Sequence, residues 1–172
     1  MNGRNSWEKD YEYGFFAEKE IAGFFEQHGY SVEYAEDYAA FTPGLYYGPR
    51  IGILPRYDYE SIEMAEVSCV YYIASDLKVS KSGKIKYVEI KRRGKFSRFN
   101  GEDIIYIDKK QFYDYCYLTD YGYDVSLMIY IDEFADKYIF TATIEKLYEN
   151  IKYKTDKFVS FRKSVFDILR TS

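Results

Sequence analysis

The fold is decided by the stretch DLKVSKSGKIKYVEIK, which occupies residues 76–91. Apolar and polar residues alternate on both sides of a polar turn, and this pattern predicts a β-hairpin. With Ser82-Gly83 as its two-residue loop, the strand pairing places Asp76 opposite Glu89. Side chains alternate along a strand, so Lys91 lies on the same face as Glu89, while the apolar residues face the other way.

Asp76, Glu89 and Lys91 together predict a divalent-metal site. Directly opposed residues have Cβ atoms roughly 4.5–5.5 Å apart. Two carboxylates at that distance repel each other, and a bound cation removes the repulsion. Such a metal activates water and polarises a phosphoryl group, while an adjacent lysine can orient or deprotonate the water, which suits phosphodiester hydrolysis. The alternative is a surface hairpin in which Glu89 and Lys91 merely lie near each other.

The composition limits both the kind of protein and the kind of metal. The chain has 172 residues, of which 47% are apolar and 30% charged, and this predicts one soluble globular domain over 1–172. One histidine and two cysteines, which form no Cys-x-x-Cys pair, exclude a zinc site built from these residue types. The expected metal is therefore a hard cation that prefers oxygen ligands, Mg²⁺ or Mn²⁺.

The charge is unevenly distributed along the chain. The net charge is −4, but residues 81–98 hold eight basic residues and one acid, so this segment carries +7 and the remainder −11. A basic segment on an acidic protein predicts contact with a nucleic-acid backbone. A solvated hairpin edge, protected from further strand pairing by its lysines, explains the same charges equally well.

The sequence predicts no contact with a membrane. No apolar run approaches the roughly 20 residues that span a bilayer. The first residues lack the basic and apolar regions of a signal peptide. We therefore expect a cytoplasmic protein.

Hydrophobic spacing predicts the other elements. Trp7 to His28 has the apolar stripe of a helix that Gly29 ends. The segment 41–57 holds all three prolines with several glycines and tyrosines, and is expected to be a loop or an insertion. The order of the expected helices and strands along the chain predicts an α+β or α/β fold in which helices cover a mixed central sheet. Strands are expected at 30–34, 67–74, 104–107 (or a loop), 125–131 and 138–143, and helices at 108–118, 144–153 and 158–169, the last two as helical additions at about 144–170.

The hairpin resembles the PD-(D/E)XK nuclease superfamily, which includes restriction enzymes, RecB-like nucleases and Holliday junction resolvases. There an Asp begins one strand and Glu-x-Lys lies on the next, as Asp76 and Glu89-Ile90-Lys91 do here. The resemblance covers about residues 15–131 and implies a restriction-endonuclease-like fold with an α-β-β-β-α-β core. It also implies a metal held by Asp76, Glu89 and the Ile90 carbonyl, Lys91 at the water, and cleavage that leaves a 5′-phosphate.

Two further residues join the predicted site through this resemblance. Glu18 lies within the apolar stripe of the first helix, where an unpaired carboxylate is costly, and superfamily members often carry there an acid that helps to hold the metal. Gln111 matches a glutamine that approaches the metal or the substrate. Each residue also has an ordinary explanation, since Glu18 can reach solvent at the edge of the stripe and Gln111 fits a capping box begun by Asp108.

The predicted nucleic-acid contacts surround this site. Basic residues directly after the second hairpin strand would meet phosphates beside the cleaved bond, where they position the strand without reading its sequence. Two lysines and a tyrosine of the next helix are added to this set. The predicted contacts are Arg92, Arg93, Lys95, Arg98, Lys109, Lys110 and Tyr115.

We therefore expect a Mg²⁺-dependent nuclease (or one that uses Mn²⁺) that acts on DNA, with branched or recombining DNA among the options and RNA as an alternative. Superfamily members often dimerise to cut both strands, so a homodimer is also considered. Two other hypotheses stay open. One is a catalytically silent nucleic-acid-binding module of the same fold, and the other is a structural domain that binds another protein through a tyrosine-rich surface.

Overall fold

Two β-sheets form the framework of the structure, a computed structural model that describes residues 6–34, 75–120, 122–132 and 137–170. Six strands pair in the order β1-β2-β3-β6-β7-β10, and four in the order β4-β5-β9-β8. β3 and β6 run parallel, and the other neighbouring strands run antiparallel. The elements are α1 (Ser6–Gln27), β1 (Ser31–Tyr34), β2 (Leu77–Lys81), β3 (Lys84–Arg93), β4 (Ser97–Phe99), β5 (Glu102–Asp108), α4 (Lys109–Asp120), β6 (Val125–Ile131), β7 (Tyr138–Thr143), α5 (Ile144–Glu149), β8 (Tyr153–Lys154), β9 (Phe158–Arg162), the 3-10 helix η2 (Lys163–Val165) and β10 (Asp167–Arg170).

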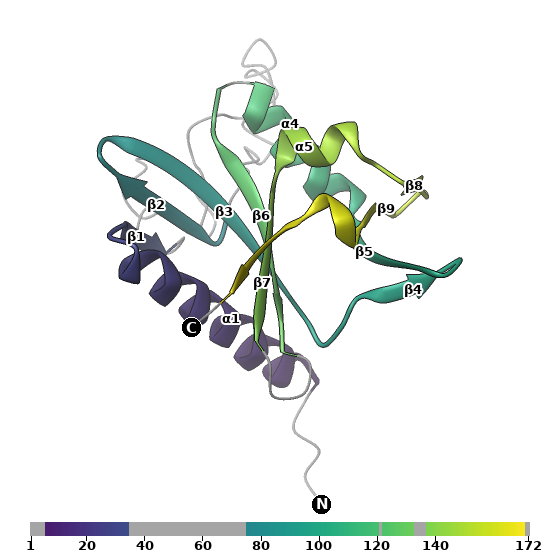
Figure 1. Cartoon of the computed structure of the whole chain (residues 1–172), viewed down its shortest axis with the longest axis horizontal. Helices are drawn as coiled ribbons and strands as arrows, with labels where there is room; N and C mark the ends of the chain where they lie inside the picture. The colour runs from purple at the N-terminus through teal and green to yellow at the C-terminus, as the bar shows by residue number, and fades with distance from the viewer. Residues whose placement is uncertain (1–5, 35–74, 121, 133–136, 171–172) are drawn as a thin grey trace, which may run out of the picture.

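The six-stranded sheet is covered on both faces. Figure 1 shows α1 on one side, with α4, α5 and the four-stranded sheet on the other. One hydrophobic cluster joins α1 to residues such as Val79, Val88 and Ile90, and a larger one joins α4 and α5 to both sheets through residues such as Phe112 and Phe161. This mixed sheet between helices confirms the predicted fold class. Among the described residues, no helix combines the length and the apolar character needed to cross a membrane.

The first helix ends as its sequence predicts. Gly29 has a φ of +78°, the left-handed conformation that glycine adopts most readily. The N–H of Gly29 donates to the carbonyl of Glu26 at 2.9 Å, and the N–H of Tyr30 donates to that of Phe25 at 3.1 Å. These two bonds form a Schellman motif, which satisfies the last carbonyls of α1 and turns the chain into β1.

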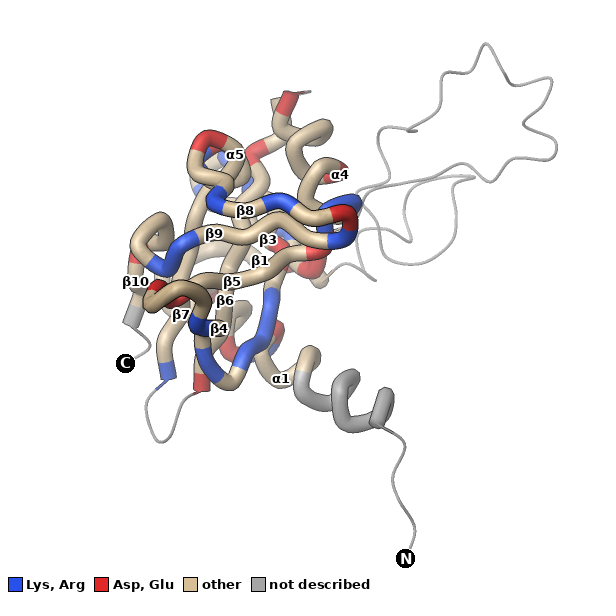
Figure 2. Tube along the Cα trace, turned by 90° about the vertical axis from the view of Figure 1, so that its right-hand side faces the viewer, with Lys and Arg blue, Asp and Glu red and all other residues tan. Residues whose placement is uncertain are grey.

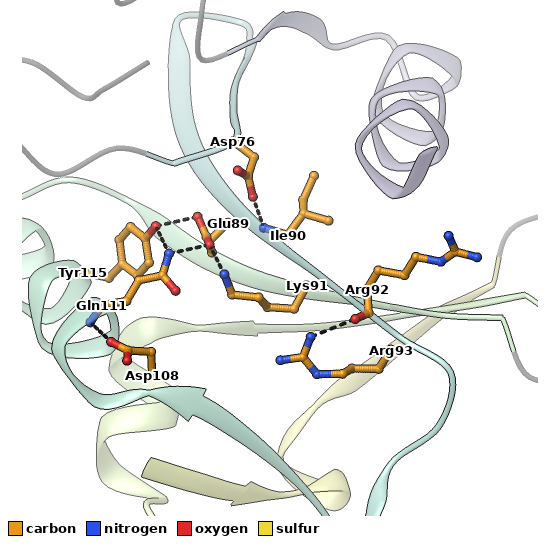
Figure 3. A network of polar contacts seen from close by, with 9 residues as sticks. All are labelled: Asp76, Glu89, Ile90, Lys91, Arg92, Arg93, Asp108, Gln111 and Tyr115. Carbon is orange, nitrogen blue, oxygen red and sulfur yellow. Dashed lines mark hydrogen bonds and ion pairs between the residues drawn. The ribbon is translucent and has the colours of Figure 1, made fainter. Parts of the chain in front are cut away.

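The β2–β3 hairpin has the predicted loop and register. Leu77 pairs with Val88 and Lys81 pairs with Lys84 across Ser82-Gly83. Both loop residues have positive φ, 52° for Ser82 and 77° for Gly83, as a type I′ turn requires. The register fixes which side chains of β3 face α1, and it leaves Glu89 and Lys91 on the face that α4 covers (Figure 3).

The connection from β3 to β6 brings α4 over the hairpin. After β3 the chain forms the β4–β5 pair and then α4 before it returns as β6, parallel to β3. Parallel neighbours need such a crossover, and the crossing helix packs on the sheet. Asp108 caps α4 as predicted, because its Oδ1 accepts the N–H of Gln111 at 2.9 Å.

The helices predicted after residue 144 are partly wrong. The helix predicted at 144–153 ends at Glu149, and Tyr153 begins β8. The helix predicted at 158–169 does not form; this segment is β9, η2 and β10 instead. β9 pairs with β5 and β10 with β7, so hydrogen bonds to distant strands override the local apolar spacing. The segment 41–57 and the strand predicted at 67–74 lie outside the described residues.

Candidate active site

The carboxylate of Glu89 is the centre of a buried polar network. Glu89 is 3% exposed. Its Oε1 accepts hydrogen bonds from Lys91 Nζ at 2.5 Å and from Gln111 Nε2 at 2.8 Å. Its Oε2 accepts the hydroxyl of Tyr115 at 2.5 Å. Figure 3 shows these three donors converging on Glu89, Lys91 from the same strand and the other two from α4. A buried carboxylate is tolerated when it is bonded in this way.

Asp76 lies beside this network, just before β2. Its Oδ2 accepts the N–H of Ile90 at 2.7 Å, so the Asp76 carboxylate contacts β3 at the residue next to Glu89. Burial raises the pKa of Asp76 from 3.8 to about 8, and the negative charges of Glu89 and Glu18 add to this rise. The Ile90 hydrogen bond and the Lys91 ammonium act in the opposite direction on the same pKa. The charges of Glu89 and Glu18 therefore both act on the Asp76 carboxyl.

Gln111 and Tyr115 reach the site because they are one helical turn apart on α4. Residues at i and i+4 lie on the same helix face, and Gln111 Nε2 also donates to the Tyr115 hydroxyl at 3.3 Å. Burial, followed by the charge of Glu89, raises the pKa of Tyr115 well above its ordinary value, so its hydroxyl stays protonated and able to donate. The Gln111 backbone takes part in the Asp108 cap while its side chain turns to Glu89.

The donor set fits a hard divalent cation. Mg²⁺ is commonly bound through one or two carboxylates, and substrate phosphates and water complete its shell. Asp76 and Glu89 offer such a pair, and burial together with the negative charge of Glu89 raises the pKa of Asp76, as expected for a buried carboxylate beside another one. In the part of the chain that the structure describes, no three acidic, histidine or cysteine side chains are arranged as a ready metal cluster. The described residues therefore fit a two-carboxylate site, in which Glu18 is not grouped with Asp76 and Glu89 as a third acidic ligand. The role of the Ile90 carbonyl stays a prediction.

The basic residues after Lys91 divide between the two faces of the sheet. Arg92 is turned toward α1, where its guanidinium pairs with Asp132 and lies 5.5 Å from the centroid of the Phe16 ring. Arg93 lies on the side of Lys91 and is exposed, with Nη1 donating to the Arg92 carbonyl (Figure 3). Arg92 is thus engaged in an intramolecular ion pair with Asp132, which no local sequence pattern predicts because the two residues are 40 positions apart.

The other predicted nucleic-acid contacts also differ in exposure. Lys95 and Arg98 are exposed, and Arg98 donates to the Gly101 carbonyl at 3.4 Å. Lys110 is exposed and pairs with Asp114, whereas Lys109 is half-buried and donates to the Thr155 carbonyl at 3.1 Å. Tyr115 is only 2% exposed, so the structure places it in the core beneath Glu89 and not on a surface that a nucleic acid could touch.

Comparison with solved structures identifies the fold. A Holliday junction resolvase, Hjc from the archaeal hyperthermophile Archaeoglobus fulgidus, superposes with a TM-score of 0.51 and 10% sequence identity. The match covers 89% of this chain and 91% of the resolvase. This chain has the restriction-endonuclease-like fold. No protein-family model matches the sequence, and no curated protein does so either.

Proposed function

We propose that this protein is a Mg²⁺- or Mn²⁺-dependent nuclease that hydrolyses phosphodiester bonds in DNA. The observation that carries the proposal is the convergence of Asp76, Glu89 and Lys91 at the β2–β3 hairpin. The likeness of the fold to a Holliday junction resolvase supports it and makes branched DNA one proposed substrate. Action as a homodimer, which would cut both strands, belongs to the same proposal.

The proposed roles follow from the position of each side chain. Asp76 and Glu89 would hold the cation, which when bound supplies an activated water and neutralises charge on the phosphoryl group. The Lys91 ammonium, 2.5 Å from Glu89 Oε1, would orient the attacking water or stabilise the charge that develops on the phosphate oxygens. Gln111 and Tyr115 would act through Glu89, as positioning residues that fix its carboxylate.

A cleavage panel tests the proposal. The substrates are linear duplex, nicked duplex, single-stranded and four-way-junction DNA, with one RNA, each incubated with Mg²⁺, with Mn²⁺ or with EDTA. Lys91→Ala is expected to remove cleavage. Lys78→Ala is the matched control, because Lys78 follows Asp76 by the same spacing but pairs with Glu33 at 2.6 Å.

The outcomes separate the competing functions. Equal product from wild type and Lys91→Ala on every substrate would show that the site assignment is wrong. Salt-dependent DNA binding without product in either metal indicates the silent binding module. The absence of both DNA binding and cleavage would indicate a domain that binds another protein. Melting curves add an independent readout, since Mg²⁺ should stabilise the wild type and should not stabilise Asp76→Ala.

A further inference from the structure

We propose that a groove between α4 and α5 binds a linear aliphatic polyamine, a flexible chain of methylene groups that carries two or more ammonium groups. The groove is apart from the candidate active site, because neither Asp76 nor Glu89 nor any residue bonded to Glu89 is among its described lining residues. The proposal therefore does not depend on the proposed nuclease function.

The groove is a cavity of about 510 Å³ between the second half of α4 and α5. Figure 1 shows these two helices next to each other. Its volume lies within the range of sites that bind small molecules, roughly 300–1,000 Å³. Tyrosines and acidic residues dominate its described lining, and they are Tyr113, Tyr117, Tyr148, Asp120, Glu145 and Glu149.

The acidic residues give the groove an excess of negative charge. No lysine or arginine is among its described lining residues. Within the described ranges, none of its three carboxylates takes part in an ion pair. Lysines of the same helices are engaged elsewhere, since Lys146 pairs with Asp167 at 3.2 Å and Lys110 pairs with Asp114 at 3.3 Å. Figure 2 shows acidic residues in red on α5 and at the end of α4, with basic residues of β8 and β9 below them.

Asp120 places its charge where α4 itself disfavours a carboxylate. It is the last residue of this 12-residue helix, which has no basic residue in its last turn. The C-terminal end of a helix carries partial negative charge, so a carboxylate there is unfavourable. Cys116, which lines the groove, responds to the same surroundings, because burial raises the pKa of its thiol to about 11 and the charge of Asp120 adds to this rise. A cation bound in the groove would offset this negative charge.

The tyrosines supply walls against which methylene groups can pack. Tyr148 is 57% exposed, so its ring is accessible at the edge of the groove. At Tyr113, Nζ of Lys154 lies 5.9 Å from the centroid of the ring, an arrangement that shows how this wall attracts an ammonium group. Long aliphatic stems with charged ends pack along apolar surface in this way while the charge stays near solvent.

The arrangement of the carboxylates favours an extended cation over a metal ion or a nucleic acid. In the described part of the chain, no three acidic, histidine or cysteine side chains are close enough together to hold one metal ion. The three acids of the groove are therefore spread along it, which matches ammonium groups separated by methylene groups. The phosphates of a nucleic acid would be repelled by the same carboxylates.

Calorimetric titrations of the protein, without nucleic acid or divalent metal, test this groove. The probes are spermidine, with three ammonium groups, and butylamine, with one. Spermidine is expected to bind more tightly than butylamine, and its affinity should fall as salt increases. The double variant Glu145→Gln/Glu149→Gln is expected to weaken spermidine binding about tenfold, because two exposed ion pairs are lost. Amide resonances that shift on titration should belong to α4 and α5.

A matched control variant lies on the other side of the six-stranded sheet. Glu26 of α1 is exposed and, among the described residues, makes no ion pair. Glu26→Gln should therefore bind spermidine as the wild type does. Circular dichroism checks that each variant is folded.

Three outcomes would overturn the proposal. The first is equal affinity of the wild type and the folded double variant for spermidine. The second is a set of shifted resonances centred on Asp76 and Glu89, which would place the cation in the candidate active site. The third is binding of a tetralysine peptide without binding of spermidine, which would make the groove a contact for another protein.

Discussion

The hydroxyl of Tyr115 donates a 2.5 Å hydrogen bond to Oε2 of Glu89, a residue 26 positions earlier in the chain. Both side chains are buried, Tyr115 at 2% and Glu89 at 3% exposure. A carboxylate in such surroundings depends on its donors, because it has lost most of its hydration. The α4 helix therefore holds the Glu89 carboxylate, on the face of β3 proposed to bind a metal.

We predict that Tyr115→Phe destabilises the protein by about 1–3 kcal/mol, since it leaves one oxygen of a buried carboxylate without its donor. The measurement is urea denaturation without metal. The stabilisation by Mg²⁺ should also shrink, because Glu89 is less well fixed. Tyr113→Phe, two positions earlier on the same helix, is the control. Equal unfolding midpoints for the two variants would show that the hydroxyl of Tyr115 does not support Glu89.

The raised pKa of Asp76 predicts how stability depends on pH without metal. The unfolded carboxyl has a pKa near 3.8 and the folded one about 8, so the folded state favours the protonated form. The stability that this group contributes is complete below pH 3.8 and is lost as pH rises toward 8. Asp76→Asn should therefore flatten this decline, which urea midpoints in EDTA across this range would measure.

The raised pKa of Asp76 also makes metal binding by the wild type depend on pH. A proton on Asp76 competes with the cation, so stabilisation by Mg²⁺ should increase as pH rises toward 8. In Asp76→Asn this increase should be absent. A parallel pH dependence of the Mg²⁺ effect in both proteins would remove Asp76 from the site.

Arg92 and Arg93 are neighbours in sequence but should behave differently when replaced. Arg92 pairs with Asp132 and lies over Phe16, so Arg92→Ala should lower the melting temperature. Arg93 is exposed on the side of Lys91, so Arg93→Ala should weaken DNA binding and reduce its salt dependence with little effect on melting. Melting curves and DNA titrations of both variants make the comparison, and a reversed pattern would contradict the assignment of faces.

Two glycines, one inside α1 and one just after its end, provide a paired test of backbone conformation. Gly29→Ala places a Cβ at φ +78°, and we expect it to destabilise the protein by about 1 kcal/mol. Gly23 lies inside α1, and a Cβ there would have no atom within 4 Å. Gly23→Ala should therefore stabilise by up to about 1 kcal/mol. Thermal melts of the two variants should shift in opposite directions.

The hairpin was predictable from sequence because its contacts are local. The loop Ser82-Gly83 fixes the register, and the register places Asp76 at the residue next to Glu89. The α1 stop at Gly29 and the α4 cap at Asp108 were predictable for the same reason, since each depends on residues within one turn. The contacts that join the hairpin, α1 and α4 connect residues far apart in the sequence, so no local pattern predicts them.

The segment 158–169 shows the limit of local pattern. Phe158, Phe161 and Phe166 are spaced as on one helix face, yet Phe161 pairs with Ile105 on a strand more than 50 residues earlier. The exposed ring of Phe158 and the buried ring of Phe161 lie on opposite faces of β9. Pairing between strands so far apart in the sequence produces no local pattern, so the helical spacing of the phenylalanines predicts a helix where a strand forms.

The parallel pairing of β3 with β6 also sets an order of events during folding. The β2–β3 hairpin closes over two residues and can form early, whereas β6 must wait for β4, β5 and α4 to be placed. We therefore expect Asp76 and Glu89 to approach each other before Gln111 and Tyr115 reach Glu89. At that stage we expect the two carboxylates to repel each other, so that a divalent cation bound between them would favour closure of the hairpin.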